Sequence, residues 1–164
     1  MFANCTSLTT VTSLPAYELA KNCYYRMFTF CVSLTNLPEL PEFSSLATGC
    51  FKSMFQYYYA LETAPRLWAE FLEDNCCEGM FLNCTKLSRV TLFIDDPEIA
   101  DSFNPELYFF NWLNGAGTKA DSPQLYLGAS IESYYGYLSY INSGYLNNDD
   151  FFPANWSVST YSEN

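Results

Sequence analysis

Seven cysteines are the residues of this 164-residue chain best suited to chemistry, and their spacing indicates what they do. The chain contains no histidine, the most frequent base beside a cysteine or serine nucleophile. Six cysteines form two columns of a sequence repeat: Cys23, Cys50 and Cys76, and Cys5, Cys31 and Cys84. We therefore predict buried thiols that act as small hydrophobic side chains, with disulfides between the columns as the alternative.

Acidic and glycine-containing segments are further candidates for chemical sites. Residues 147–150, Asn-Asn-Asp-Asp, are rich in the oxygen atoms that calcium prefers, but they lack the alternating pattern of a calcium loop. We interpret them as a solvated acidic turn. Residues 115–117 lack the spacing and the following Lys-Ser/Thr of a phosphate-binding loop. The sequence therefore predicts no enzyme, no cofactor and no metal site.

Aromatic residues are the other candidates for a binding site, since they make up 19% of the chain. Exposed tyrosines are suited to contacts with a partner protein or a sugar ring. We take Tyr135, Tyr137 and Tyr140 as candidate binding residues. A second group is predicted to form core instead: Phe109, Phe110, Trp112 and Trp156.

Charge and hydropathy exclude several classes of partner. The net charge is −11, so a phosphate backbone would be repelled and nucleic acid is not expected as a partner. Residues 1–93 carry eight acidic and six basic groups, whereas residues 94–164 carry ten acidic groups and one lysine. No run of about 18 apolar residues is present, which argues against membrane insertion. No signal peptide is visible.

A repeat of about 26 residues organises the first part of the chain. A Met-Phe pair recurs at steps of 26, 27 and 26 residues, at Met1, Met27, Met54 and Met80. A fixed period in this range is typical of stacked repeats. We divide residues 1–93 into a half repeat at 1–14 and repeats at 15–40, 41–67 and 68–93, followed by an acidic, aromatic-rich cap at 94–164. Because the first unit is a half repeat, we expect either a longer parent chain or a neighbouring copy against it.

Each repeat is predicted to contain a short helix and a short strand. Steps of four separate Leu19, Cys23 and Met27, which places them on one face of a helix. The strands are expected within residues 7–14, 33–40, 60–67 and 86–93. A further helix is predicted over residues 97–113 of the cap.

Alternation along these strands predicts one outward-facing surface. It is polar and nearly uncharged, and we take it as a candidate binding surface for another protein. Its residues are Thr10, Thr12, Asn36, Pro38, Thr63, Pro65, Arg89 and Thr91.

The repeat resembles the BspA-like class of leucine-rich repeats. The resemblance rests on the segment MFANCTSL and its counterparts MFTFCVSL and MFLNCTKL, and it covers residues 1–93. Tyr58 departs from it by replacing a cysteine. The resemblance implies an α/β solenoid with a strand and a helix in each leucine-rich repeat, to which we add a C-terminal α+β cap. It also implies a surface-exposed or secreted bacterial protein.

These features lead to three hypotheses about function. The first is a non-enzymatic module for protein–protein interaction or adhesion, whose partner is a protein or another cell-surface ligand. The second is a structural component of a phage or cell-surface fibre, which predicts a homo-oligomer. The third is glycan binding through the tyrosines of the cap.

Overall fold

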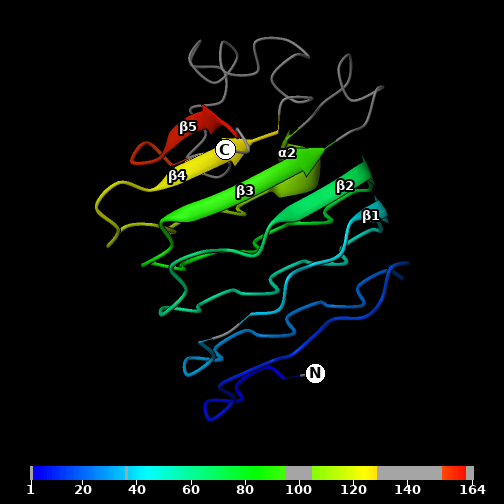
Figure 1. Ribbon diagram of the computed structural model, residues 1–164, viewed down its shortest axis with the longest axis horizontal. Coiled ribbons are helices and arrows are strands. Elements are labelled where there is room, and N and C mark those ends of the chain that lie inside the picture. Colours follow the sequence, from blue (N-terminus) through cyan, green and yellow to red (C-terminus); the bar gives the residue numbers. More distant parts are fainter. Residues whose placement is uncertain (1, 36, 95–104, 129–152, 162–164) are drawn as a thin grey trace.

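A parallel five-stranded sheet runs through the computed structural model, which describes residues 2–35, 37–94, 105–128 and 153–161. The strand order β1-β2-β3-β4-β5 follows the order in the chain. The strands are β1 (Phe43–Leu46), β2 (Leu67–Leu72), β3 (Arg89–Ile94), β4 (Gln124–Leu127) and β5 (Ser157–Thr160). Figure 1 shows them rising in this order away from the N-terminus.

Neighbouring strands are parallel, and their paired residues lie about one repeat apart in the sequence. Phe43 of β1 lies opposite Ala69 of β2, and Leu67 of β2 lies opposite Leu92 of β3. Strand β1 lies beyond the predicted window 33–40, and β2 starts at the last residue of the window 60–67, because those windows contain Pro38 and Pro65. Proline lacks the N–H that a sheet ladder needs, so regular pairing begins only after it.

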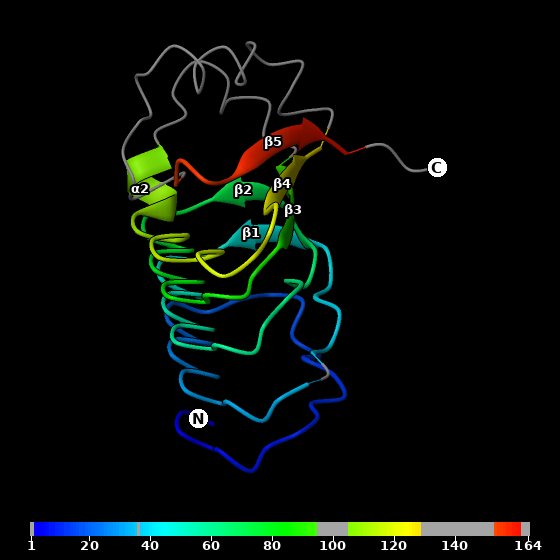
Figure 2. The same cartoon turned by 90° about the vertical axis from the view of Figure 1, so that its left-hand side faces the viewer.

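Consecutive turns, rather than helices, form the other side of each repeat. Within residues 20–31, local bonds such as Cys23 N–H to Ala20 O alternate with bonds to the next repeat, such as Tyr24 N–H to Cys50 O. The same pattern recurs in residues 47–58 and 73–84, and we call these segments the turn stack. Figure 2 shows it on the side of the molecule away from the strands.

Left-handed residues recur at every fourth position of the turn stack. Asn22, Arg26 and Phe30 have φ angles of 58°, 53° and 59°, and the equivalent residues of the next repeat are Gly49, Ser53 and Tyr57. The third repeat continues with Asn75, Gly79 and Asn83. A right-handed helix excludes such angles, so the backbone turns back at each of these positions.

The predicted α/β solenoid with a helix in each repeat and an α+β cap is therefore wrong. The step of four that indicated a helix comes instead from pairs of successive turns. In the described ranges the longest α-helix is α2 (Pro105–Phe109), which has five residues. The helix predicted over 97–113 is also wrong for residues 110–113, which form turns.

The core consists of side chains stacked from one repeat to the next. Phe55 is 1% exposed, and its ring lies 5.6 Å from that of Phe28 and 5.7 Å from that of Phe81. Phe2 continues this ladder on Phe28 at 6.0 Å. Parallel stacking at this spacing, with offset rings, is favourable for aromatic pairs. The repeat in the sequence thus becomes a continuous ladder of rings along the stack.

The sheet continues past the predicted repeat–cap boundary at residue 93. Strand β3 pairs with β4, and β4 pairs with β5. Residues 110–119 form further turns, in which Asn111 and Gly115 are again left-handed. The indole N–H of Trp156 donates to Ala116 O at 3.1 Å and so ties the segment before β5 to these turns. The core prediction is confirmed for Phe109, Trp112 and Trp156, whereas Phe110 is 42% exposed.

Candidate binding groove

The predicted strand-face residues do not form one exposed surface. Thr10, Thr12, Thr63 and Arg89 are exposed as expected. The outward orientation is wrong for Pro38, Pro65 and Thr91, which are buried. Thr91 lies inside β3, between its neighbours β2 and β4, whereas the two prolines lie where regular strand pairing is absent. Asn36 and the candidate tyrosines Tyr135, Tyr137 and Tyr140 lie outside the described residues.

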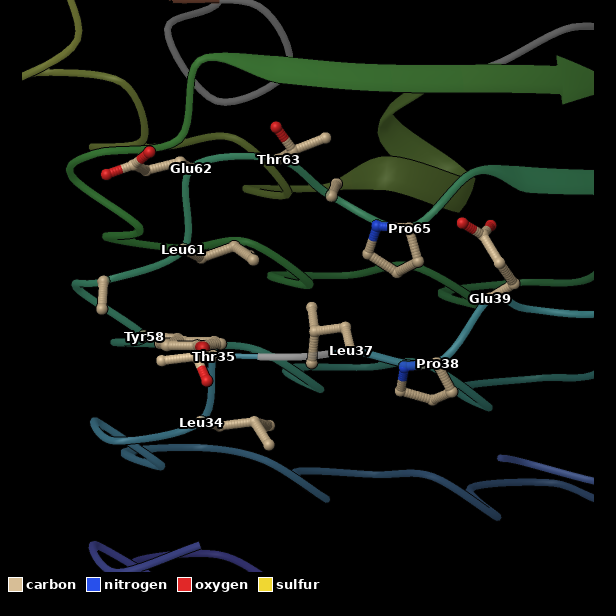
Figure 3. Close-up of a pocket in the computed structure, with 12 residues that line it drawn as sticks. Leu34, Thr35, Leu37, Pro38, Glu39, Tyr58, Leu61, Glu62, Thr63 and Pro65 are labelled. Carbon is tan, nitrogen blue, oxygen red and sulfur yellow. The ribbon is translucent and has the colours of Figure 1, made fainter. Parts of the chain in front are cut away.

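A groove of about 520 Å³ brings three of the predicted residues, Pro38, Thr63 and Pro65, together. It runs between a lower wall of residues 34, 35 and 37–39 and an upper wall of residues 58–65, and Figure 3 shows Leu34 and Pro38 below Leu61 and Pro65. The remaining lining residues are Leu34, Thr35, Leu37, Glu39, Tyr58, Ala60, Leu61, Glu62 and Ala64. A volume in this range is typical of ligand-binding clefts.

The groove opens because the backbones of its two walls are bonded to other repeats. Thr35 N–H donates to Thr9 O on the preceding repeat, and Ala64 N–H donates to Arg89 O on the following one. Between the described residues of 33–42 and residues 59–65, no backbone hydrogen bond crosses the gap. Pro38 and Pro65 stand at equivalent positions of the two walls, and neither can donate such a bond.

Tyr58 removes a second connection between the same two repeats. In the equivalent column, the Cys31 thiol donates to Phe2 O at 2.9 Å and the Cys84 thiol donates to Phe55 O at 3.1 Å. Each thiol therefore ties its repeat to the preceding one. Tyr58 occupies this column between them and has no thiol, and its ring lines the groove instead.

The floor of the groove is apolar and its rim is acidic. Leu34 is fully buried, Leu61 is 4% exposed and Tyr58 is 2% exposed. Burial raises the pKa of the Tyr58 phenol to about 12, so the floor is uncharged at neutral pH. Glu39 and Glu62 are exposed, one on each wall, and the lining contains neither lysine nor arginine.

Two arginines flank the upper wall, Arg66 next to Pro65 in the chain and Arg89 paired with Thr63, and each lies over an aromatic ring. The Arg89 guanidinium lies 4.6 Å from the centre of the Tyr126 ring, and that of Arg66 lies 5.9 Å from the centre of the Phe93 ring. Both contacts are made on the side of the later strands. Both guanidinium groups keep their positive charge, so the acidic character belongs to the lining itself, in which Glu39 and Glu62 are the charged side chains.

The cysteines of the described structure are free, and five of the seven are buried. Cys23 is exposed and Cys5 is half-buried, so the prediction of buried thiols is wrong for Cys23. Burial raises the pKa of the Cys50 and Cys77 thiols above the usual range and that of Cys84 to about 12. Such thiols remain protonated at neutral pH and are poor nucleophiles.

Within the described ranges, no group of three or more Cys, Asp or Glu side chains is placed to hold a metal ion. The same part of the chain has no helix long and apolar enough to cross a membrane.

Comparison of the chain with protein-family models, curated proteins and solved structures finds no match. The case for a binding site therefore rests on the groove itself.

Most of the groove was missed at the level of sequence. The strand-face pattern found Pro38, Thr63 and Pro65 but not the leucines, Tyr58 or the two glutamates. Two signals were available in the sequence. Prolines recur at equivalent positions of adjacent repeats at 38 and 65, and the one tyrosine in a cysteine column falls between them.

Proposed function

We propose that this chain is a non-enzymatic protein-recognition module that holds a segment of its partner in the groove between residues 34–39 and 58–65. The observation that carries the proposal is the gap of about 520 Å³ between two otherwise hydrogen-bonded repeats. Leu37 and Ala60, which are not buried, give hydrophobic contact beside the buried Leu34, Leu61 and Tyr58. Exposed polar groups at the rim fix the orientation of the bound segment. The surface location implied by the resemblance to BspA-like repeats belongs to the same proposal.

The neighbouring repeats supply a rigid frame for the groove. The turn stack is hydrogen-bonded on one side of it, for example through Phe30 N–H to Gln56 O. On the other side, β1 pairs with β2 from Phe43 onward. Because both ends of the gap are fixed, binding requires little ordering of the protein, which favours affinity.

The experiment is an unbiased selection of peptides from a random 12-residue library displayed on phage, with the full chain as bait. The variant Thr63→Trp places a large side chain at the exposed rim of the groove. Its matched control is Thr10→Trp, at the equivalent exposed position of the first repeat. We expect the wild type and the control to retain the selected peptides and Thr63→Trp to lose them.

Two results would overturn this function. One is the absence of any enriched peptide, and the other is enrichment that Thr63→Trp leaves unchanged. Circular dichroism of each variant checks that the substitution has not unfolded the chain.

A further inference from the structure

Two backbone N–H groups on the groove walls could donate hydrogen bonds to an extended chain. The N–H groups of Glu39 and Thr63 are not donors in any backbone hydrogen bond of the described structure. They stand on opposite walls, as Figure 3 shows. An extended segment offers carbonyl groups at regular intervals, and main-chain bonds of this kind are the basis of strand addition to a sheet.

The side chains of the groove favour an extended peptide in which two kinds of side chain alternate. Successive side chains of an extended segment point in opposite directions. One set would meet Leu37 and Ala60, the apolar lining residues that are not buried. The other set would point toward the rim, where Glu39 and Glu62 are exposed. Figure 3 places these two glutamates toward opposite ends of the groove.

The charge of the rim determines which side chains of the occupant are favoured there. Both glutamates at the rim are exposed, and the lining carries no basic residue to neutralise them. Residues 1–93, which contain the groove, carry eight acidic and six basic groups, so their net charge has the same sign as the two glutamates. Basic side chains are attracted under these conditions, and acidic ones are repelled.

From these observations, and resting on the proposed function, we infer that the occupant of the groove is an extended peptide segment in which apolar residues alternate with lysine or arginine. Its apolar side chains contact Leu37 and Ala60, the apolar lining residues that are not buried, and its basic side chains pair with Glu39 and Glu62. A volume of about 520 Å³ suits a segment of a few residues rather than a folded domain.

The test uses the peptides enriched in the selection described above, and it adds two charge-reversal variants. The first variant combines Glu39→Lys with Glu62→Lys. The control combines Glu18→Lys with Glu70→Lys, which changes the net charge equally at exposed positions outside the groove lining. Binding is measured by fluorescence anisotropy at low and high salt.

We expect the enriched peptides to carry an excess of lysine and arginine at alternate positions. The groove variant should bind them about tenfold more weakly, because two attractive pairs become repulsive, while the control stays within about twofold. Raising the salt concentration should weaken wild-type binding as the charges are screened.

The outcomes separate this inference from the proposed function. Peptides that are lost in Thr63→Trp but carry no basic excess and tolerate the groove charge reversal would overturn the inference and leave the recognition function standing. Peptides that bind Thr63→Trp as well as the wild type would overturn the recognition function, and the inference with it. A neutral or acidic consensus would likewise contradict the occupant proposed.

Discussion

Substitution of Gly79 by alanine distinguishes the turn stack from the helix predicted by the residue spacing, because the two structures give opposite signs. Gly79 lies in the turn stack with a φ angle of +59°. In a helix interior, Gly→Ala would stabilise the chain by about 1 kcal/mol. At a left-handed position, a side chain costs about 1–2 kcal/mol of backbone strain.

The space around Gly79 makes this a test of the backbone alone. A Cβ atom at Gly79 would lie 3.4 Å from Ser53 Oγ and 3.9 Å from Leu82 Cβ. Both are ordinary contacts or close to them, so a steric clash adds little to the strain. We therefore expect Gly79→Ala to lower the free energy of unfolding by about 1–2 kcal/mol.

The assay is equilibrium urea denaturation under reducing conditions, followed by circular dichroism, with comparison at constant m-value. Ala20→Gly serves as the reverse exchange at an exposed position that is not left-handed, and it should destabilise the chain by about 0.5–1 kcal/mol. A higher free energy of unfolding for Gly79→Ala than for the wild type would refute the left-handed turn.

Three further predictions follow from burial and hydrogen bonding. Phe55→Ala should lower the free energy of unfolding by about 3–5 kcal/mol in urea denaturation, because it breaks the aromatic ladder. The control Tyr17→Ala, at a 72% exposed position, should change it by less than about 0.5 kcal/mol, and equal effects of the two substitutions would contradict the ladder. Because the pKa of Tyr58 is about 12 in the folded chain and about 10 in the unfolded chain, the free energy of unfolding should fall as the pH rises from 10 to 12. Tyr58→Phe should make that fall shallower by about 1.4 kcal/mol per pH unit, and an unchanged slope would contradict the raised pKa of Tyr58. Trp156→Phe should lower the free energy of unfolding by about 1–3 kcal/mol, since it leaves the buried Ala116 carbonyl without its indole donor; a melting temperature equal to that of the wild type would argue against this bond.

The repeat itself could be predicted from sequence, because stacking preserves the spacing of buried residues. Met27, Met54 and Met80 are all buried, as their recurrence indicates. The local conformation could not be predicted from the same spacing. A step of four places side chains on one face of a helix, but it also places them on one side of two successive turns.

The residues that precede the cysteines of one column favour turns over a helix. Asn22, Gly49 and Asn75 directly precede the cysteines of one column, and all three are left-handed. Asparagine and glycine are the residues that most readily adopt positive φ. A column that contains only these two types indicates a turn at a fixed position rather than a helix.

The groove was harder to predict because it depends on a difference between repeats. Pattern analysis identifies what successive repeats share, whereas the groove arises where Tyr58 replaces a cysteine and prolines interrupt both walls. Its glutamates follow no period of the repeat, so their convergence appears only when the two walls are seen together.

The origin of the groove has a consequence for the number of sites on such a chain. Each wall is one repeat with a proline at the same position, at Pro38 or Pro65. Copying residues 41–67, the repeat that carries both Tyr58 and Pro65, would create a second groove without altering the first, because the described residues of each repeat bond to the adjacent repeats. Two grooves in adjacent repeats could then bind the same partner at once. Avidity would rise because the second binding event is intramolecular and occurs at a high effective concentration. Valency would therefore change by whole repeats, with the chemistry of each site conserved.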